Sequence, residues 1–109
     1  MSRSARKRAD HAFASITQVV PESLTPVFAI VRDVSESGVG VTAMQPLKVP
    51  GTVRASISIG EDVFEMTLRV ARCDSCDGRY SVGLRFPKND PGRAAFLAAF
   101  LAHERQRAG

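Results

Sequence analysis

The feature that most constrains the fold is a strict alternation of apolar and polar residues, which recurs three times in the second half of the chain. The stretches read VRASISI (53–59), FEMTLRV (64–70) and YSVGLRF (80–86), with an apolar residue at every second position. A period of two is that of a β-strand with one buried face. Turn-forming residues at 60–62 and 73–78 separate the stretches. The pattern therefore predicts a three-stranded antiparallel meander.

Three further strands are predicted upstream, at about 13–20, 27–32 and 39–43, because these segments are rich in β-branched and aromatic residues. Pro21 and Pro26 lie between the first two of these segments, and Pro46 and Pro50 follow the third. Proline cannot donate a hydrogen bond within a β-ladder, so the prolines set limits to the strands.

The segment from Asp90 to Arg105 is predicted to be a helix. Asp90 suits the N-cap and Pro91 the first helical position. One side of this helix is apolar, formed by Phe96, Leu97, Phe100 and Leu101. Such a stripe packs on a sheet or closes one end of a barrel. Six strands and one helix predict an all-β domain over residues 12–109, built as a six-stranded antiparallel β-barrel with a C-terminal helix.

The positive charge of the chain is concentrated at its N-terminus. The net charge is +4, and Arg3, Arg6, Lys7 and Arg8 precede the first acidic residue. Residues 1–11 lack large apolar side chains after Met1 and are expected to form a flexible basic arm. This distribution favours a local anion clamp over a broad nucleic-acid-binding face. The chain has no Trp and one Tyr, and its Phe residues fall largely on expected core positions, so no base-stacking platform is expected either.

Other classes of function have little support in the sequence. No apolar run approaches the ~18–20 residues of a membrane span, and no signal peptide is present, so a cytoplasmic protein without membrane contact is expected. No nucleophile–base pair or carboxylate dyad indicates an enzyme. Cys73 and Cys76 are interpreted as two thiols in a hairpin turn, with a redox pair or a partial metal site as the alternative. No metal or other cofactor is predicted.

The segment VRDVSESGVGV (31–41) contains more polar chemistry than a tight turn needs. Asp33, Ser35 and Gly38 are expected to lie in one turn between two strands. Asp33 offers a carboxylate and Ser35 a hydroxyl. Gly38 is able to adopt a positive φ and to let a ligand approach the backbone closely. The segment is therefore the candidate binding element.

Three features together resemble the PilZ domain, a bacterial receptor module for cyclic di-GMP. They are a basic cluster that ends at His11, the Asp33-x-Ser35-x-x-Gly38 turn, and the late strand that ends in GLRF (83–86). The resemblance covers nearly the whole chain and implies a six-stranded β-barrel with a C-terminal helix. It also implies that cyclic di-GMP is bound by Arg6, Lys7, Arg8, His11, Asp33, Ser35, Gly38 and Arg85.

The basic arm departs from the family pattern, which has an Arg-x-x-x-Arg motif. Arg3, Arg6 and Arg8 are followed four positions later by Lys, Asp and Ala. The register of the turn places the second arginine of the family at or near His11, and a neutral imidazole cannot form a guanidinium fork. The resemblance thus implies a receptor that relays the second messenger to an unidentified effector protein, in regulation of the motility, pilus or biofilm type. The alternative is a degenerate adaptor that binds proteins but no nucleotide.

Overall fold

Strand β3 (Val27–Val34) closes a barrel, because it pairs with β2 (Ala12–Val20) on one edge and with β4 (Gly38–Ala43) on the other. The structure is a computed structural model and describes residues 7–8 and 12–108. Its elements are β1 (Lys7–Arg8), β2 (Ala12–Val20), β3 (Val27–Val34), β4 (Gly38–Ala43), β5 (Gly51–Ile59), β6 (Asp62–Cys76), β7 (Arg79–Arg85) and α1 (Arg93–Ala108).

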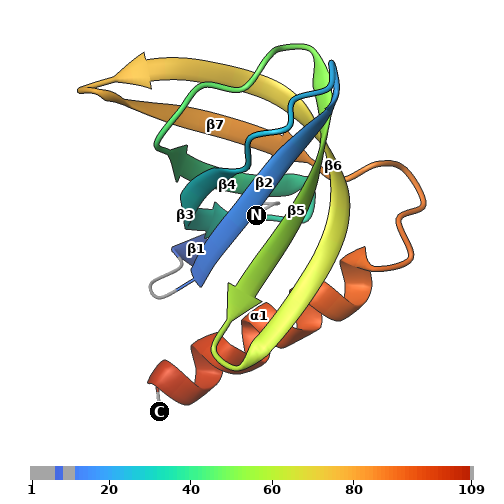
Figure 1. The fold of residues 1–109 in the computed structure, drawn as a ribbon. Coiled ribbons are helices and arrows are strands. Elements are labelled where there is room, and N and C mark those ends of the chain that lie inside the picture. The colour runs from blue at the N-terminus through green and yellow to red at the C-terminus, as the bar shows by residue number, and fades with distance from the viewer. Residues whose placement is uncertain (1–6, 9–11, 109) are drawn as a thin grey trace.

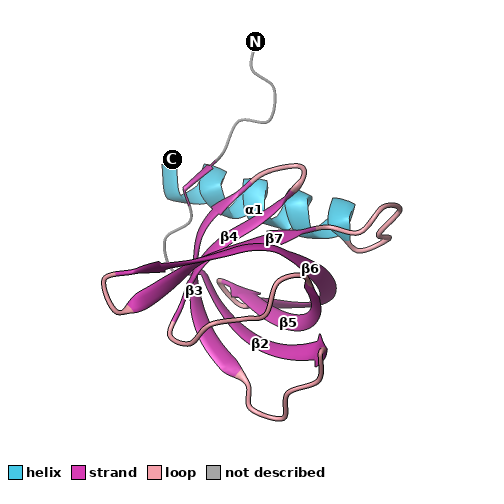
Figure 2. Ribbon diagram, turned by 90° about the horizontal axis from the view of Figure 1, so that it is seen from above, coloured by secondary structure: helices cyan, strands magenta, loops and turns pink. Residues whose placement is uncertain are grey.

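Antiparallel pairing runs from β3 through β2, β5, β6 and β7 to β4, which pairs back to β3 (Figure 1). The predicted fold, a six-stranded antiparallel β-barrel with a C-terminal helix, is therefore confirmed. Closure leaves few unpaired strand edges. Figure 2 shows the strands curving round to enclose the core. The alternating apolar positions of the meander face this core, with Val53, Ile57 and Leu68 fully buried.

The prediction of a turn over 73–78 is wrong, because β6 continues through Cys76. Cys73 pairs with Val82 and Cys76 with Arg79, so only Asp77 and Gly78 turn the chain. Both have a positive φ, as a two-residue hairpin turn requires.

The strand geometry also decides between the two interpretations of the cysteines. Residues three apart on a strand point to opposite faces and are separated by about 10 Å, beyond the ~7 Å that a disulfide can bridge. Cys73 packs against the core and Cys76 is exposed. The two cannot form a redox pair with each other, and the described residues include no cluster of three metal-ligating side chains.

Helix α1 lies beneath the barrel in Figure 1. It packs against that end through two buried phenylalanine rings. Phe96 makes edge contacts with Phe64 and Phe86, at centroid distances of 5.5 and 6.0 Å. Phe100 is also buried, whereas Leu101 remains 42% exposed. The predicted apolar stripe therefore packs on the barrel through Phe96, Phe100 and the partly buried Leu97. Within the described part of the chain, no helix is long and apolar enough to span a membrane.

The helix begins at Arg93 and not at the predicted Asp90–Pro91. Asp90 Oδ1 accepts a hydrogen bond from Gly92 N at 3.0 Å, and the Asp90 carbonyl accepts one from Arg93 N at 3.2 Å. These bonds close a separate turn before the helix, which is the usual alternative for an Asp side chain.

Candidate functional site

Asp33 lies within β3 and not in the turn where it was predicted. Val31 pairs with Val41 and Asp33 with Gly40, which makes Arg32 the extra residue of a β-bulge. Val31 and Val34 are buried, whereas Arg32 and Asp33, which lie between them, are half-buried. The bulge therefore turns Asp33 to the outer face of the barrel.

The Asp33 carboxylate occupies the space above Gly40. A Cβ on Gly40 would come within 2.6 Å of Asp33 Oδ1, so any other residue there would displace the carboxylate from this position. The next glycine across the sheet is Gly83 of β7, the partner of Gly40 in the ladder. Asp33 is thus held beside a floor of two neighbouring glycines.

Ser35 begins the polar turn and is buried, with 7% of its surface exposed. Its backbone N donates to the Gly38 carbonyl at 2.9 Å. Its Oγ accepts a hydrogen bond from Ser37 N at 3.3 Å and lies 3.1 Å from Ser37 Oγ. The hydroxyl therefore stabilises the turn, and it still faces a pocket on the outer surface.

Gly38 is needed for a reason other than the predicted positive φ. The glycines with a positive φ in the described chain are Gly60 and Gly78. Gly38 lies in β4 opposite Arg85, and a Cβ there would lie 1.9 Å from the carbonyl oxygen of Leu84. Glycine at this position lets β4 approach β7 closely.

A pocket of about 350 Å³ lies between the turn and the β6–β7 pair. The predicted residues Ser35, Gly38 and Arg85 line it together, and so does Arg72, which the sequence did not indicate as a site residue. Among the residues that the structure describes, the lining contains two arginines and two serines and no carboxylate. Its chemistry is that of an anion site.

A second bulge directs Arg72 to this pocket. Val70 pairs with Leu84 and Arg72 with Gly83, so Ala71 is the extra residue. Without it, Arg72 would continue the inward face of Leu68 and Val70. The Arg72 guanidinium lies above Gly83, where a Cβ would be 3.6 Å from its Nη2. The break in the alternation after Val70 was the only sequence signal for this residue.

Strand β1 borders the same face of the barrel. In β1, Lys7 is the partner of Val34 and Arg8 the partner of Asp33. A two-residue strand thus lies within the segment predicted to be a flexible arm. The predicted site residues Arg6 and His11 lie outside the described residues. Arg8, Asp33, Gly40, Gly83 and Arg72 form one row of ladder partners across five strands.

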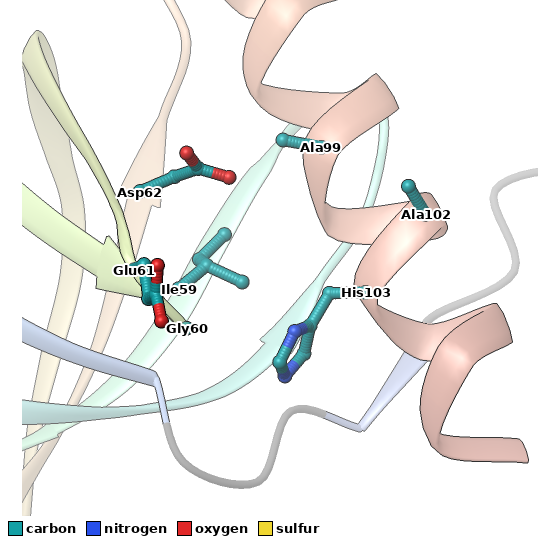
Figure 3. A pocket seen from close by; sticks show the side chains of 7 residues that line it. All are labelled: Ile59, Gly60, Glu61, Asp62, Ala99, Ala102 and His103. Carbon is teal, nitrogen blue, oxygen red and sulfur yellow. The ribbon is translucent and has the colours of Figure 1, made fainter.

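A different pocket, of about 380 Å³, lies between the β5–β6 turn and α1 (Figure 3). The His103 ring of α1 lies above Gly60, and Glu61 and Asp62 of the turn also line the pocket. None of the predicted site residues whose side chains the structure describes lines this pocket. The candidate site is therefore the face described above.

A model of one protein family matches this chain. It is the PilZ domain, and the match covers residues 3–103 of 109. The search of curated proteins finds no significant match.

Proposed function

Because this chain belongs to the PilZ domain family, whose members are cyclic di-GMP-binding adaptor domains, we propose that it binds cyclic di-GMP on the outer face of β3, β4 and β7. The bound state is then communicated to a partner protein. The proposed role is that of a receptor and not of a catalyst.

The observation that carries the proposal is the convergence of the motif residues on one face. Ser35, Gly38 and Arg85 line one pocket, and Asp33 lies in the adjoining row of the ladder. A carboxylate such as Asp33 accepts from the N–H donors of guanine. Arginine pairs with phosphate or with the O6/N7 edge of guanine. The face thus offers groups for both parts of a guanine nucleotide.

The position of β1 supports a mechanism for the relay. In the described part of the chain, β1 pairs with two residues of β3, and so short a ladder contains few backbone hydrogen bonds. A ligand that contacts both Asp33 and the basic arm binds more tightly when the arm lies on the barrel. It therefore shifts the population of the protein toward that state. The arm on the barrel is then the surface that the partner recognises.

One alternative has an observation of its own. The sequence lacks Arg-x-x-x-Arg, and Phe13 and Phe28 stack on the outer face with 44% and 52% of their surfaces exposed. Phe13 and Phe28 are therefore exceptions to the expectation that most phenylalanines of the chain face the core. Exposed paired aromatic rings suit a protein interface. A nucleotide-independent adaptor would use this patch.

The test is isothermal titration calorimetry of the full chain with cyclic di-GMP. We expect micromolar binding by the parent and at least a tenfold loss in Asp33→Ala and in Ser35→Ala, with about 1 kcal/mol or less of lost stability. Asp62→Ala and Ser56→Ala are matched controls away from the face and should bind like the parent. Absence of heat with the parent would favour the adaptor. Unchanged affinity in both site variants would contradict the proposed site.

A further inference from the structure

The outer face of β6 and β7 carries a cluster of arginines next to the motif turn. Arg69 and Arg85 are direct partners in the ladder, and both are exposed. Like charges directly opposite each other destabilise an antiparallel pair. Arg72 joins them because the bulge at Ala71 turns it outward. Three guanidinium groups thus share one surface, and an anion bound there would relieve their repulsion.

The Arg72 side chain keeps most of its hydrogen-bonding capacity. Its Nε lies 3.3 Å from Asp74 Oδ2, in a pair whose two side chains are more than half exposed. Such an exposed pair contributes little to stability. A guanidinium has five N–H donors, and this contact uses the Nε side. The pair therefore orients the guanidinium above Gly83 and leaves donors for a ligand.

The turn adds hydroxyl groups opposite the arginines. Ser35 and Ser37 line the same pocket as Arg72 and Arg85. Guanidinium and hydroxyl donors are suited to a phosphate group, and none of the described residues that line this space is a carboxylate. The pocket of about 350 Å³ is larger than one phosphate group, so the rest of a nucleotide can extend from it along the glycine floor.

We propose that Arg69, Arg72 and Arg85 form a phosphate-binding cluster on the barrel itself, which binds a phosphate group of the nucleotide independently of the N-terminal arm. This inference rests on the proposed function for the identity of the nucleotide. Arg72 and Arg85 make the contacts from the pocket. Arg69 raises the positive potential beside them.

Charge-matched variants of the full chain test the cluster. Arg72→Ala and Arg85→Ala are each expected to weaken cyclic di-GMP binding about tenfold, and the double variant by more. Arg54→Ala removes the same charge from the outer face of β5, in a different pocket, and should change affinity less than twofold. If Asp33→Ala loses binding while Arg72→Ala and Arg85→Ala bind like the parent, the proposed function stands and the cluster is refuted.

A second probe separates the two proposals if the parent binds no cyclic di-GMP. The proposed function is then wrong, and the full chain is titrated with inorganic pyrophosphate while amide chemical shifts are followed. Shifts at Gly83 and Arg85 that disappear in Arg72→Ala but persist in Arg54→Ala would support the cluster. Absence of selective shifts at these amides would overturn it.

Discussion

Alanine at Gly38 is expected to destabilise the barrel by about 2–4 kcal/mol. The new Cβ would lie 1.9 Å from the Leu84 carbonyl oxygen and 3.0 Å from Arg85 Cα, both of them backbone atoms. β4 must therefore move away from β7 by more than 1 Å to restore an ordinary contact of about 3.5 Å. Overpacking of this kind costs about 1–3 kcal/mol, and each hydrogen bond lost with it about 1 kcal/mol. The Phe86 N to Ser37 O bond, at 3.0 Å, joins the residues next to this contact and is one of the bonds at risk.

Gly83 provides a matched control on the adjacent strand. A Cβ there meets the Arg72 guanidinium at 3.6 Å, an ordinary contact with a side chain that can move. Gly83→Ala makes the same change to the unfolded chain, where alanine has fewer conformations than glycine. Its stability should therefore stay within about 1 kcal/mol of the parent. The difference between the two variants isolates the clash in the native state.

Urea denaturation followed by circular dichroism measures this difference, with the slope m required to stay unchanged. Thermal unfolding should place the Tm of Gly38→Ala about 8–16 °C below that of the parent, since 1 kcal/mol shifts a domain of this size by about 4 °C, and Gly83→Ala should stay within about 4 °C of the parent. Equal midpoints for the two variants would refute the close approach of β4 and β7 as the reason for glycine at 38.

Two further predictions concern the scaffold, both measured by urea denaturation. The buried Gln18 side chain accepts a hydrogen bond from Lys48 N at 2.8 Å and donates one to Lys48 O at 3.0 Å, in the loop before β5. Gln18→Ala should lower the free energy of unfolding by about 2–3 kcal/mol, because both backbone groups of Lys48 lose their partner. A loss below about 0.5 kcal/mol would contradict this role. Phe96→Ala should lower the free energy of unfolding by about 3–5 kcal/mol, because its ring is fully buried under the barrel. Leu101→Ala, on the same helix, should lower it by less than about 1 kcal/mol. Equal losses in the two variants would show that Phe96 does not hold the helix on the barrel.

The meander was predictable because burial of one strand face imprints a period of two on the sequence. β5 and β7 follow the predicted alternation to their ends, and β6 follows it as far as Val70. The bulges at Arg32 and Ala71 were not predictable, since the insertion of one residue is decided by how the barrel closes and not by local propensity. β1 was missed for a related reason, because it consists of two basic residues joined to β3 through their backbone.

The sequence predicted which residues belong to the candidate site better than it predicted where they lie in the sheet. Ser35 and Arg85 do meet at one pocket, although they are far apart in the sequence. A glycine in a polar segment does not reveal whether it serves a positive φ or a close approach, so the structural reason for Gly38 was predicted wrongly. Arg72 follows the end of the regular alternation, and the face it occupies depends on the bulge at Ala71. Its position could not be predicted without the pairing of β6 and β7.

The two bulges and the two glycines act together on one row of the ladder. One bulge turns Asp33 outward above Gly40, and the other turns Arg72 outward above Gly83. Because Gly40 and Gly83 are ladder partners, a carboxylate and a guanidinium lie on neighbouring positions of a floor that carries no side chain of its own. Under the proposed function, the carboxylate suits the N–H donors of guanine and the guanidinium suits its phosphate. A barrel with regular strands would direct Arg72 into its core, so the irregularities of the sheet are what gives this face its chemistry.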